Sequence, residues 1–266
     1  MNTKKFIHPT AVVSPKAHLD EGVSIGPYCC VGDHVVLKKG VQLVSHVVVD
    51  GHTRIGEDSV IFPFSSIGLR PQDKKFHGED SFLEIGNNCH IREHVTINPG
   101  TEGGGLYTRI GNDCLLMVAS HVAHDCHLGD HVILSNNATL AGHVFVDDFA
   151  ILGGLSAVHQ FVRIGRHAMI GGATGVEGDV IPFGMVLGNR AKLVGLNLVG
   201  LKRRGFSTQT IQSLRALYSD LFEENDGTIF AKRVENATQK YLSNLEAQEI
   251  LEFILKQSQR PLCQAR

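Results

Sequence analysis

The chain has 266 residues, enough for one large domain or two modest ones. Its formal net charge of −2 gives no overall attraction to nucleic acid. We expect no membrane span, because the sequence contains no apolar run of about 18 residues. The N-terminal segment MNTKKFIHPT lacks the apolar core of a signal peptide, so the sequence predicts a cytoplasmic protein.

Aliphatic residues occupy every sixth position in three runs between Ile7 and Val176, separated by the segments 68–84 and 98–109. A period of six fits neither a single helix nor an alternating strand. It is typical of short strands joined by turns, each directing one aliphatic side chain inward, which coil into a solenoid. A β-sandwich would instead show alternation interrupted about every 8–12 residues.

This pattern resembles the hexapeptide-repeat family over about residues 7–187. In that family three hexads form one coil of a left-handed parallel β-helix. The resemblance implies an all-β domain of this fold at 1–189, with loops at 68–84 and 98–109. Long loops on a regular scaffold usually carry function. GGG at 103–105 lacks the strand and helix of a phosphate-binding loop and is interpreted as flexible.

Helical patterns replace the hexads toward the C-terminus. The segment 207–222 spaces its apolar residues as a helix does, ENDG at 224–227 interrupts the pattern, and a weaker stripe covers 230–241. SNLE at 243–246 has the form of a capping box with its serine as the N-cap, and predicts a further helix. We therefore expect a small α-helical C-terminal domain at 190–266.

The stretch ASHVAHDCH, 119–127, contains three histidines, an aspartate and a cysteine. In a coil of three hexads, residues about 18 apart stack roughly 4.8 Å from one another. His124 would then stack on Gly142, and Asp125 on His143. The residues expected at this corner are His121, His124, Asp125, Gly142, His143, His159 and Gln160.

A histidine beside a carboxylate suits general base catalysis, because the ordinary imidazole pKa is about 6.5. A glycine at the same corner leaves its backbone N–H uncovered, as an oxyanion donor requires. HVAHDCH could also supply some of the ligands of a zinc site. We interpret the cluster as an acid–base site and expect no metal. The six cysteines include no C-x-x-C pair and are interpreted as reduced.

Several longer motifs narrow the resemblance: PQDKKFHGE, SHVAHDC, NNATLAGHV, AVHQF and GLKRRGF. Together they resemble the cytoplasmic UDP-N-acetylglucosamine O-acyltransferases, which begin lipid A biosynthesis. The resemblance spans nearly the whole chain. It implies transfer of an R-3-hydroxyacyl chain from acyl carrier protein to the glucosamine 3-hydroxyl of UDP-N-acetylglucosamine. It also implies a homotrimer with active sites between neighbouring subunits, and no cofactor beyond the phosphopantetheine of the carrier protein.

The resemblance also implies roles for individual residues. His124 would deprotonate the sugar hydroxyl, Asp125 would orient His124, and the Gly142 N–H would face the oxyanion. The substrate-binding residues would be Gln72, Asp73, Lys75, His121, His143, His159, Gln160, Asn197 and Arg203, the first three reaching in from a neighbouring subunit. Lys202, Arg203 and Arg204 would contact acyl carrier protein, and Gly172, Arg190 and Met117 would measure the acyl chain.

The chain departs from the family pattern at two positions. Val199 stands where the family commonly has a glutamate, and Arg190 where it commonly has a histidine. Gly172 is expected to leave room for a long acyl chain.

Other functions stay open at this point. A related N-acyltransferase would use a 3-amino sugar. The next acyltransferase of the pathway carries an N-terminal uridine-binding domain, for which hexads beginning at Ile7 leave no room. A zinc hydratase like the γ-class carbonic anhydrases and a binding scaffold are the remaining alternatives.

Overall fold

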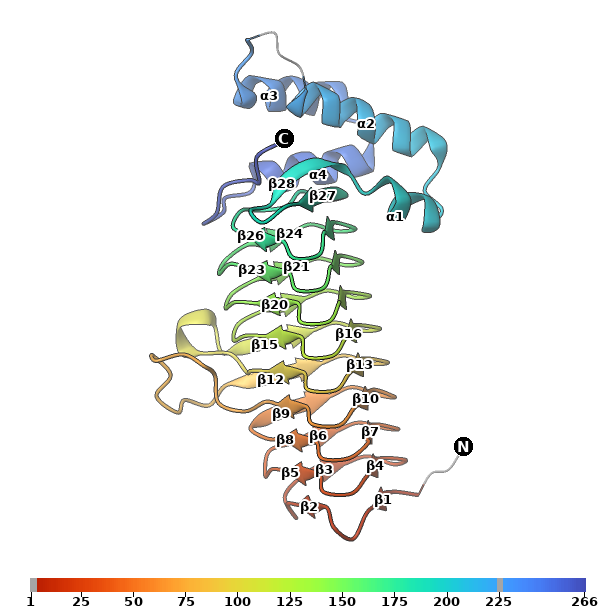
Figure 1. Cartoon of the computed structure of the whole chain (residues 1–266), viewed down its shortest axis with the longest axis vertical. Helices are drawn as coiled ribbons and strands as arrows, with labels where there is room; N and C mark the ends of the chain where they lie inside the picture. The colour runs from red at the N-terminus through yellow and green to blue at the C-terminus, as the bar shows by residue number, and fades with distance from the viewer. Residues whose placement is uncertain (1–3, 224–226) are drawn as a thin grey trace.

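The computed structural model describes residues 4–223 and 227–266. Short strands wind into a column of stacked coils, with a hairpin and helices at its C-terminal end (Figure 1). The strands form three sheets, and each third strand along the chain joins the same sheet. All pairs are parallel except the last, β27 with β28. Phe6 pairs with Ser24 and Val12 with Cys30, so an uninterrupted coil has the expected length of three hexads.

The strands are distributed as follows. The first sheet contains β1 (Phe6–Ile7), β4 (Ser24–Ile25), β7 (Gln42–Leu43), β10 (Val60–Ile61), β13 (His90–Ile91), β16 (Leu115–Leu116), β19 (Ile133–Leu134), β22 (Ile151–Leu152), β25 (Met169–Ile170), β27 (Gly184–Leu187) and β28 (Lys192–Leu196). The second contains β2 (Val12–Val13), β5 (Cys30–Val31), β8 (Val48–Val49), β11 (Ser66–Ile67), β14 (Thr96–Ile97), β17 (His121–Val122), β20 (Thr139–Leu140), β23 (Ala157–Val158) and β26 (Gly175–Val176). The third contains β3 (His18–Leu19), β6 (Val36–Leu37), β9 (His52–Ile55), β12 (Phe82–Ile85), β15 (Tyr107–Ile110), β18 (His127–Leu128), β21 (Phe145–Val146) and β24 (Arg163–Ile164).

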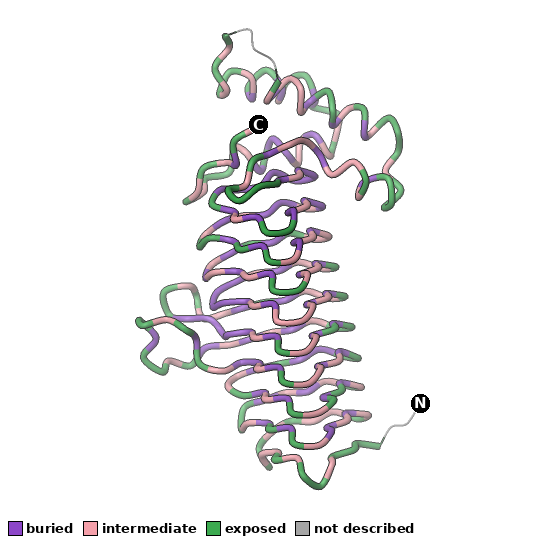
Figure 2. The backbone as a smooth tube through the Cα atoms, in the orientation of Figure 1, coloured by how far each residue is buried: buried purple, intermediate pink, exposed green. Residues whose placement is uncertain are grey.

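The core of the column is the predicted aliphatic series. Each of β1–β26 ends at one residue of that series, and from Ile25 onward these residues are buried. Figure 2 shows the buried positions recurring on every coil. Ile7 is 44% exposed, because the first coil has no coil beneath it. One inward side chain per strand is therefore enough to fill the narrow interior.

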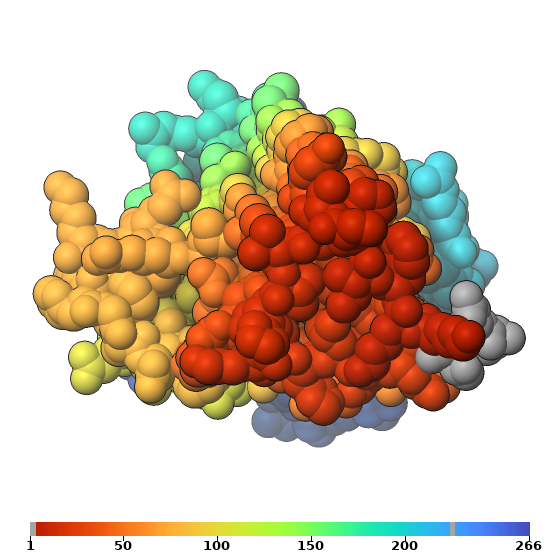
Figure 3. Space-filling model, turned by 90° about the horizontal axis from the view of Figure 1, so that it is seen from below, coloured from red at the N-terminus to blue at the C-terminus, as the bar shows by residue number. Residues whose placement is uncertain are grey.

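Two insertions leave the column at the same corner, between the second and third sheets. One joins β11 to β12, and the other joins β14 to β15. The predicted loops 68–84 and 98–109 coincide with them, although the last three residues of each loop belong to strand β12 or β15. In the view along the column, the orange segment of the first insertion stands out from one side (Figure 3).

The C-terminal helices confirm the predicted helical stripes. They are α1 (Leu198–Arg203), α2 (Thr208–Phe222), α3 (Phe230–Lys240) and α4 (Leu245–Leu255). The short helix α1 was not predicted, because its six residues carry no clear apolar stripe. The predicted boundary between 189 and 190 falls in the turn joining β27 to β28, and stays a prediction. Over residues 4–223 and 227–266, no helix is long and apolar enough to cross a membrane.

One detail of the helix prediction was wrong. The N-cap of α4 is Asn244, whose side-chain oxygen accepts the Ala247 N–H at 2.7 Å. The capping box beginning at Ser243 is thus out of register by one residue. The predicted break at ENDG lies mostly at 224–226, outside the described residues.

Two arginines of the last coils attach helix α4 to the column. The Arg163 Nε atom lies 2.7 Å from Oδ2 of Asp179, and the same guanidinium donates to the Phe253 carbonyl of α4 at 3.1 Å. Arg166 pairs with Glu249 of α4 at 2.6 Å. Helix α4 is therefore held against the last coils by charge-assisted hydrogen bonds.

Truncating one inward side chain should test the packing of the column. Leu134 is 0% exposed, so Leu134→Ala should lower the free energy of unfolding by about 2–5 kcal/mol. Leu242 is 64% exposed, and Leu242→Ala should change it by less than about 0.5 kcal/mol. Chemical denaturation of both variants checks this. Equal effects would show that the interior does not depend on the aliphatic series.

Candidate active site

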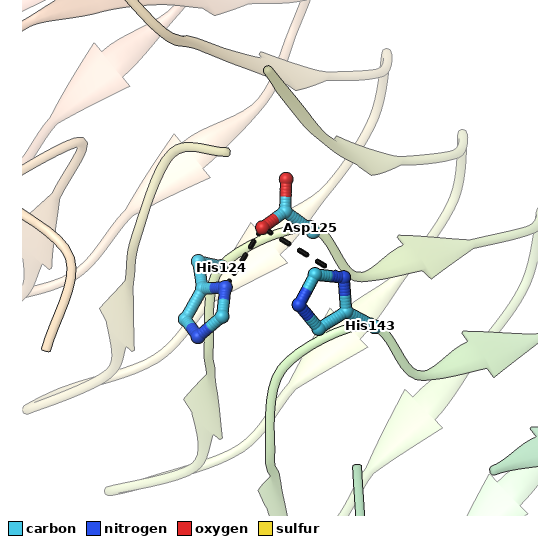
Figure 4. A group of neighbouring side chains, drawn as sticks. All are labelled: His124, Asp125 and His143. Atoms are coloured by element: carbon cyan, nitrogen blue, oxygen red, sulfur yellow. Dashed lines mark hydrogen bonds and ion pairs between the residues drawn. The ribbon is translucent and has the colours of Figure 1, made fainter. Parts of the chain in front are cut away.

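A buried histidine–aspartate pair lies at the corner where the two insertions leave the column. His124 and Asp125 occupy the turn between β17 and β18, and are 6% and 2% exposed. The His124 Nδ1 atom lies 2.7 Å from Oδ2 of Asp125 (Figure 4). A carboxylate accepts this hydrogen bond, so the proton of the neutral ring is on Nδ1. Nε2 is then left with a lone pair that can accept a proton.

The second insertion holds Asp125 in its ionised form. The Thr101 backbone N–H and hydroxyl donate to its carboxylate at 2.9 and 2.6 Å. Burial alone would raise the pKa of Asp125, but the hydrogen bonds from His124 and Thr101 outweigh it, so the pKa lies below its ordinary value. Asp125 can therefore stabilise a positive charge on His124.

The glycines of this insertion correct one expectation. GGG at 103–105 is not simply a flexible loop, because residues Glu102–Gly104 form a short 3-10 helix against Asp125. A Cβ added at Gly104 would lie 1.9 Å from the Asp125 carboxyl carbon. Only a glycine lets the backbone approach this closely. Beyond the interruption of the hexads and the GGG run, the sequence contained no recognisable signal that Thr101 and Gly104 would contact Asp125.

Gly142 lies one coil above His124, as the coil length predicted. A Cβ added there would lie 2.5 Å from Cε1 and 2.7 Å from Nε2 of the His124 ring. The Gly142 carbonyl accepts the Phe161 N–H at 3.3 Å. Gly142 is a buried residue, and its own N–H has no acceptor within the described part of the chain. An N–H without a protein acceptor, beside a base, is suited to an oxygen of a bound substrate or intermediate.

Two further histidines lie near the pair. The His143 ring is 5.0 Å from the His124 ring, and its Nδ1 atom is 3.9 Å from Oδ2 of Asp125. The His121 Nδ1 atom lies 2.6 Å from the Thr96 hydroxyl. Burial lowers the pKa of both His121 and His143, and nearby His124 lowers that of His121 further. At neutral pH both rings are therefore uncharged hydrogen-bonding groups.

The first insertion brings a second carboxylate to the site. Oδ2 of Asp73 lies 3.9 Å from Nε2 of His124, and the Lys75 N–H donates to Oδ1 of Asp73 at 3.0 Å. The resemblance implied that this loop reaches the site of a neighbouring subunit. In the structure Asp73 faces His124 of its own chain, because the loop leaves the column at the same corner. Lys75 and Gln72 are exposed beside it.

Several expected substrate-binding residues lie away from the pair. His159 and Gln160 are exposed in the turn after β23, one coil beyond His143, where both contact Arg260. Asn197 caps α1, and its side chain also donates to the His167 carbonyl at 3.0 Å. Within the described residues, no hydrogen bond or ion pair joins these residues to His124.

The residues expected to contact the carrier protein and the acyl chain also lie apart from the pair. Lys202 and Arg203 are exposed on α1, and Arg204 lies 4.4 Å over the Phe149 ring. Val199, the first departure from the family pattern, is 62% exposed. The residues of the proposed acyl ruler are Gly172 in an exposed turn, Met117 beside β16, and Arg190, which pairs with Glu177 at 2.8 Å. Their roles stay predictions.

His124, Asp125 and His143 also place three possible metal-ligand atoms within 4.8 Å of one another. The oxygens of Asp125 already accept hydrogen bonds from Thr101 and from His124. That arrangement fits an oriented base, and the expectation of no metal stays a prediction.

Comparisons with known proteins agree with this geometry. A family model described as UDP-N-acetylglucosamine O-acyltransferase, domain 2, matches residues 179–263, and a model of six bacterial transferase hexapeptide repeats matches residues 107–142. The acyl-[acyl-carrier-protein]--UDP-N-acetylglucosamine O-acyltransferase of Rhizobium johnstonii is 48% identical to the chain, covering 96% of it and 93% of the relative. The enzyme of the same name from Thermodesulfovibrio yellowstonii is 49% identical, covering 97% and 98%. The solved structure of LpxA from Acinetobacter baumannii is 43% identical with a TM-score of 0.93, covering 97% and 100%.

Fold and site together define a hexapeptide-repeat acyltransferase. The predicted fold class, an all-β left-handed parallel β-helix followed by a small α-helical domain, is confirmed. The extent of the similarity narrows the class further: the chain belongs to the acyl-[acyl-carrier-protein]--UDP-N-acetylglucosamine O-acyltransferase family.

Alanine substitutions at two adjacent glycines should distinguish the effect of crowding Asp125 from the effect of stiffening the loop. Gly104→Ala places a methyl group against the Asp125 carboxylate and should lower kcat/KM for acyl transfer by about 100-fold. A Cβ at Gly103 meets no atom within 4 Å, so Gly103→Ala should leave kcat/KM within about twofold. Steady-state kinetics checks this. Full activity of Gly104→Ala would show that the position of Asp125 does not matter.

Proposed function

We propose that this chain transfers an R-3-hydroxyacyl chain from acyl carrier protein to the glucosamine 3-hydroxyl of UDP-N-acetylglucosamine, the first step of lipid A biosynthesis. The relatives' names support an O-acyltransferase and favour a hydroxyl over an amine as the acceptor. The observation on which the proposal rests is the buried Asp125–His124 hydrogen bond. It leaves the lone pair of His124 Nε2 beside the N–H of Gly142, which has no acceptor in the described part of the chain.

The proposed reaction uses these groups in turn. Nε2 of His124 removes the proton of the 3-hydroxyl as its oxygen attacks the thioester carbonyl, and Asp125 stabilises the imidazolium. The carbonyl electron pair moves onto oxygen, and the Gly142 N–H donates to the resulting oxyanion. When the carbonyl re-forms, the C–S bond breaks, and the imidazolium returns its proton to the departing thiolate. The products are the ester and the free thiol of the carrier protein.

The remaining expected residues complete the proposal. The residues that bind the UDP-sugar in this proposal are Gln72, Asp73, Lys75, His121, His143, His159, Gln160, Asn197 and Arg203. Lys202, Arg203 and Arg204 form a cationic cluster that suits an acidic carrier protein. The chain forms a homotrimer with active sites between neighbouring subunits. No further cofactor is needed, because the thioester supplies the activated acyl group, and the reaction takes place in the cytoplasm.

Removal of the base should abolish the chemistry without disturbing the fold. His124→Ala should lower kcat by about 100- to 10,000-fold, because the general base is lost while the coil core is intact. His127→Ala is the matched control: this half-buried histidine, three residues on, stacks on Phe145, and no hydrogen bond joins it to Asp125 among the described residues. It should keep kcat within about threefold. The assay follows transfer from R-3-hydroxyacyl carrier protein to UDP-N-acetylglucosamine with metal-free protein, and near-normal turnover of His124→Ala would refute the base assignment.

The acyl-chain ruler is tested by filling Gly172. A Cβ there meets only the Gly154 carbonyl at 3.3 Å, so Gly172→Met should fold and shorten the preferred acyl chain. Gly154, one coil earlier, has similar room, its Cβ meeting only the Asn136 carbonyl at 3.3 Å, and Gly154→Met should leave the preference unchanged. A panel of carrier proteins with different 3-hydroxyacyl chains measures this. An unchanged profile for Gly172→Met would place the ruler elsewhere.

A further inference from the structure

The chain that follows α4 returns to the column and is fixed there by backbone hydrogen bonds. The Asp179 N–H donates to the Pro261 carbonyl at 2.8 Å, and the Cys263 N–H donates to the Asp179 carbonyl at 2.8 Å. A Cβ at Gly178 would lie 2.7 Å from the Pro261 carbonyl oxygen, which shows how closely the two segments pack. We call residues 257–263 the C-terminal strap.

Arg260 of the strap reaches the turn that follows β23. Its Nε atom donates to the Gln160 carbonyl at 2.8 Å, and its terminal nitrogen Nη2 contacts Nδ1 of His159. These contacts join residues about 100 positions apart in the chain. A guanidinium fork holding both a side chain and a backbone carbonyl restricts the turn more than a single bond would.

The contact also determines which nitrogen of His159 carries the proton. A guanidinium can only donate, so Nδ1 of His159 must accept, and the proton of the neutral ring is on Nε2. A longer contact of 3.4 Å from the same Nδ1 to the Gln160 carbonyl would need the opposite tautomer. The Arg260 contact is shorter and charge-assisted, and it therefore decides the tautomer.

The same turn leads directly to the acid–base pair. Phe161, the next residue, donates its N–H to the Gly142 carbonyl, and its ring stacks on His143 with centroids 4.5 Å apart. His143 in turn faces Asp125. The strap also lines a cavity of about 290 Å³ beside His143 and Phe161, through Gln257, Ser258 and Gln259.

We propose that Arg260 is a positioning residue for the UDP-sugar: it holds His159 with Nε2–H directed outward as a donor to a substrate oxygen, and fixes the Gln160 turn beside it. This inference rests on the proposed function and deepens it, because it adds a residue outside the hexad motifs to the substrate site. Arg260 acts through His159 and Gln160 and does not itself touch the reacting atoms.

The test measures both binding and turnover. Arg260→Ala should raise KM for UDP-N-acetylglucosamine, and its Kd by calorimetry, by about tenfold or more, while kcat falls less than about threefold. Arg260→Lys, which keeps one donor, should recover part of the loss. The matched control is Gln264→Ala, which removes the side-chain contact of Lys192 with the residue directly after the strap but leaves the turn alone, and should change neither constant.

A double-mutant cycle with His159→Ala separates positioning from a general loss of structure. Because Arg260 acts partly through His159, the loss of affinity in the double variant should be smaller than the sum of the losses in the two single variants. Fully additive losses, or an unchanged Kd in Arg260→Ala, would overturn the inference and leave the proposed function standing. A wild-type protein that binds no UDP-N-acetylglucosamine would overturn both.

Discussion

Backbone hydrogen bonds between successive coils are the constraint on which the rest of this structure depends. They set each residue directly above its counterpart one coil earlier, so that His121, Thr139 and Ala157 form one ladder. The corners of the coils are aligned in the same way. The His143 N–H donates to the His124 carbonyl, and the Phe161 N–H donates to the Gly142 carbonyl. Side chains far apart in the sequence therefore meet at fixed height and spacing.

The active corner combines this regular stacking with two irregular insertions. Without the insertions, the Asp125 carboxylate would accept a hydrogen bond from the His124 side chain but none from Thr101. The second insertion adds two donors from Thr101 and covers the carboxylate, while the first brings Asp73 to the other side of His124. A buried, hydrogen-bonded carboxylate of lowered pKa is what a neighbouring base needs to hold a positive charge.

The column was predictable from the sequence, because each strand contributes one aliphatic residue at a constant interval and the coil length follows from it. That interval alone predicts that Gly142 lies above His124. The contributions of Thr101, Gly104 and Asp73 were not accessible in the same way. They come from insertions whose paths depend on tertiary contacts, and no periodic pattern fixes the height at which a loop returns.

The contact between the C-terminal strap and the column was even less predictable from the sequence. Nothing in the sequence around Arg260 indicates that it meets the turn at His159, since the two residues are about 100 positions apart and the hairpin and the helices lie between them. The short helix α1 escaped prediction for a related reason. Its residues are helical because Asn197 caps them against the last coil, and not because of an apolar stripe.

The central claim is that Asp125 holds His124 with its proton on Nδ1 and its lone pair on Nε2. Nitrogen-15 NMR of histidine-labelled protein at neutral pH, with His124→Gln used to assign the signal, measures this directly. The account predicts that His124 is the Nδ1–H tautomer in wild-type protein and loses that preference in Asp125→Ala. A His124 ring protonated on Nε2 in the wild type would contradict it, because no lone pair would then face the substrate.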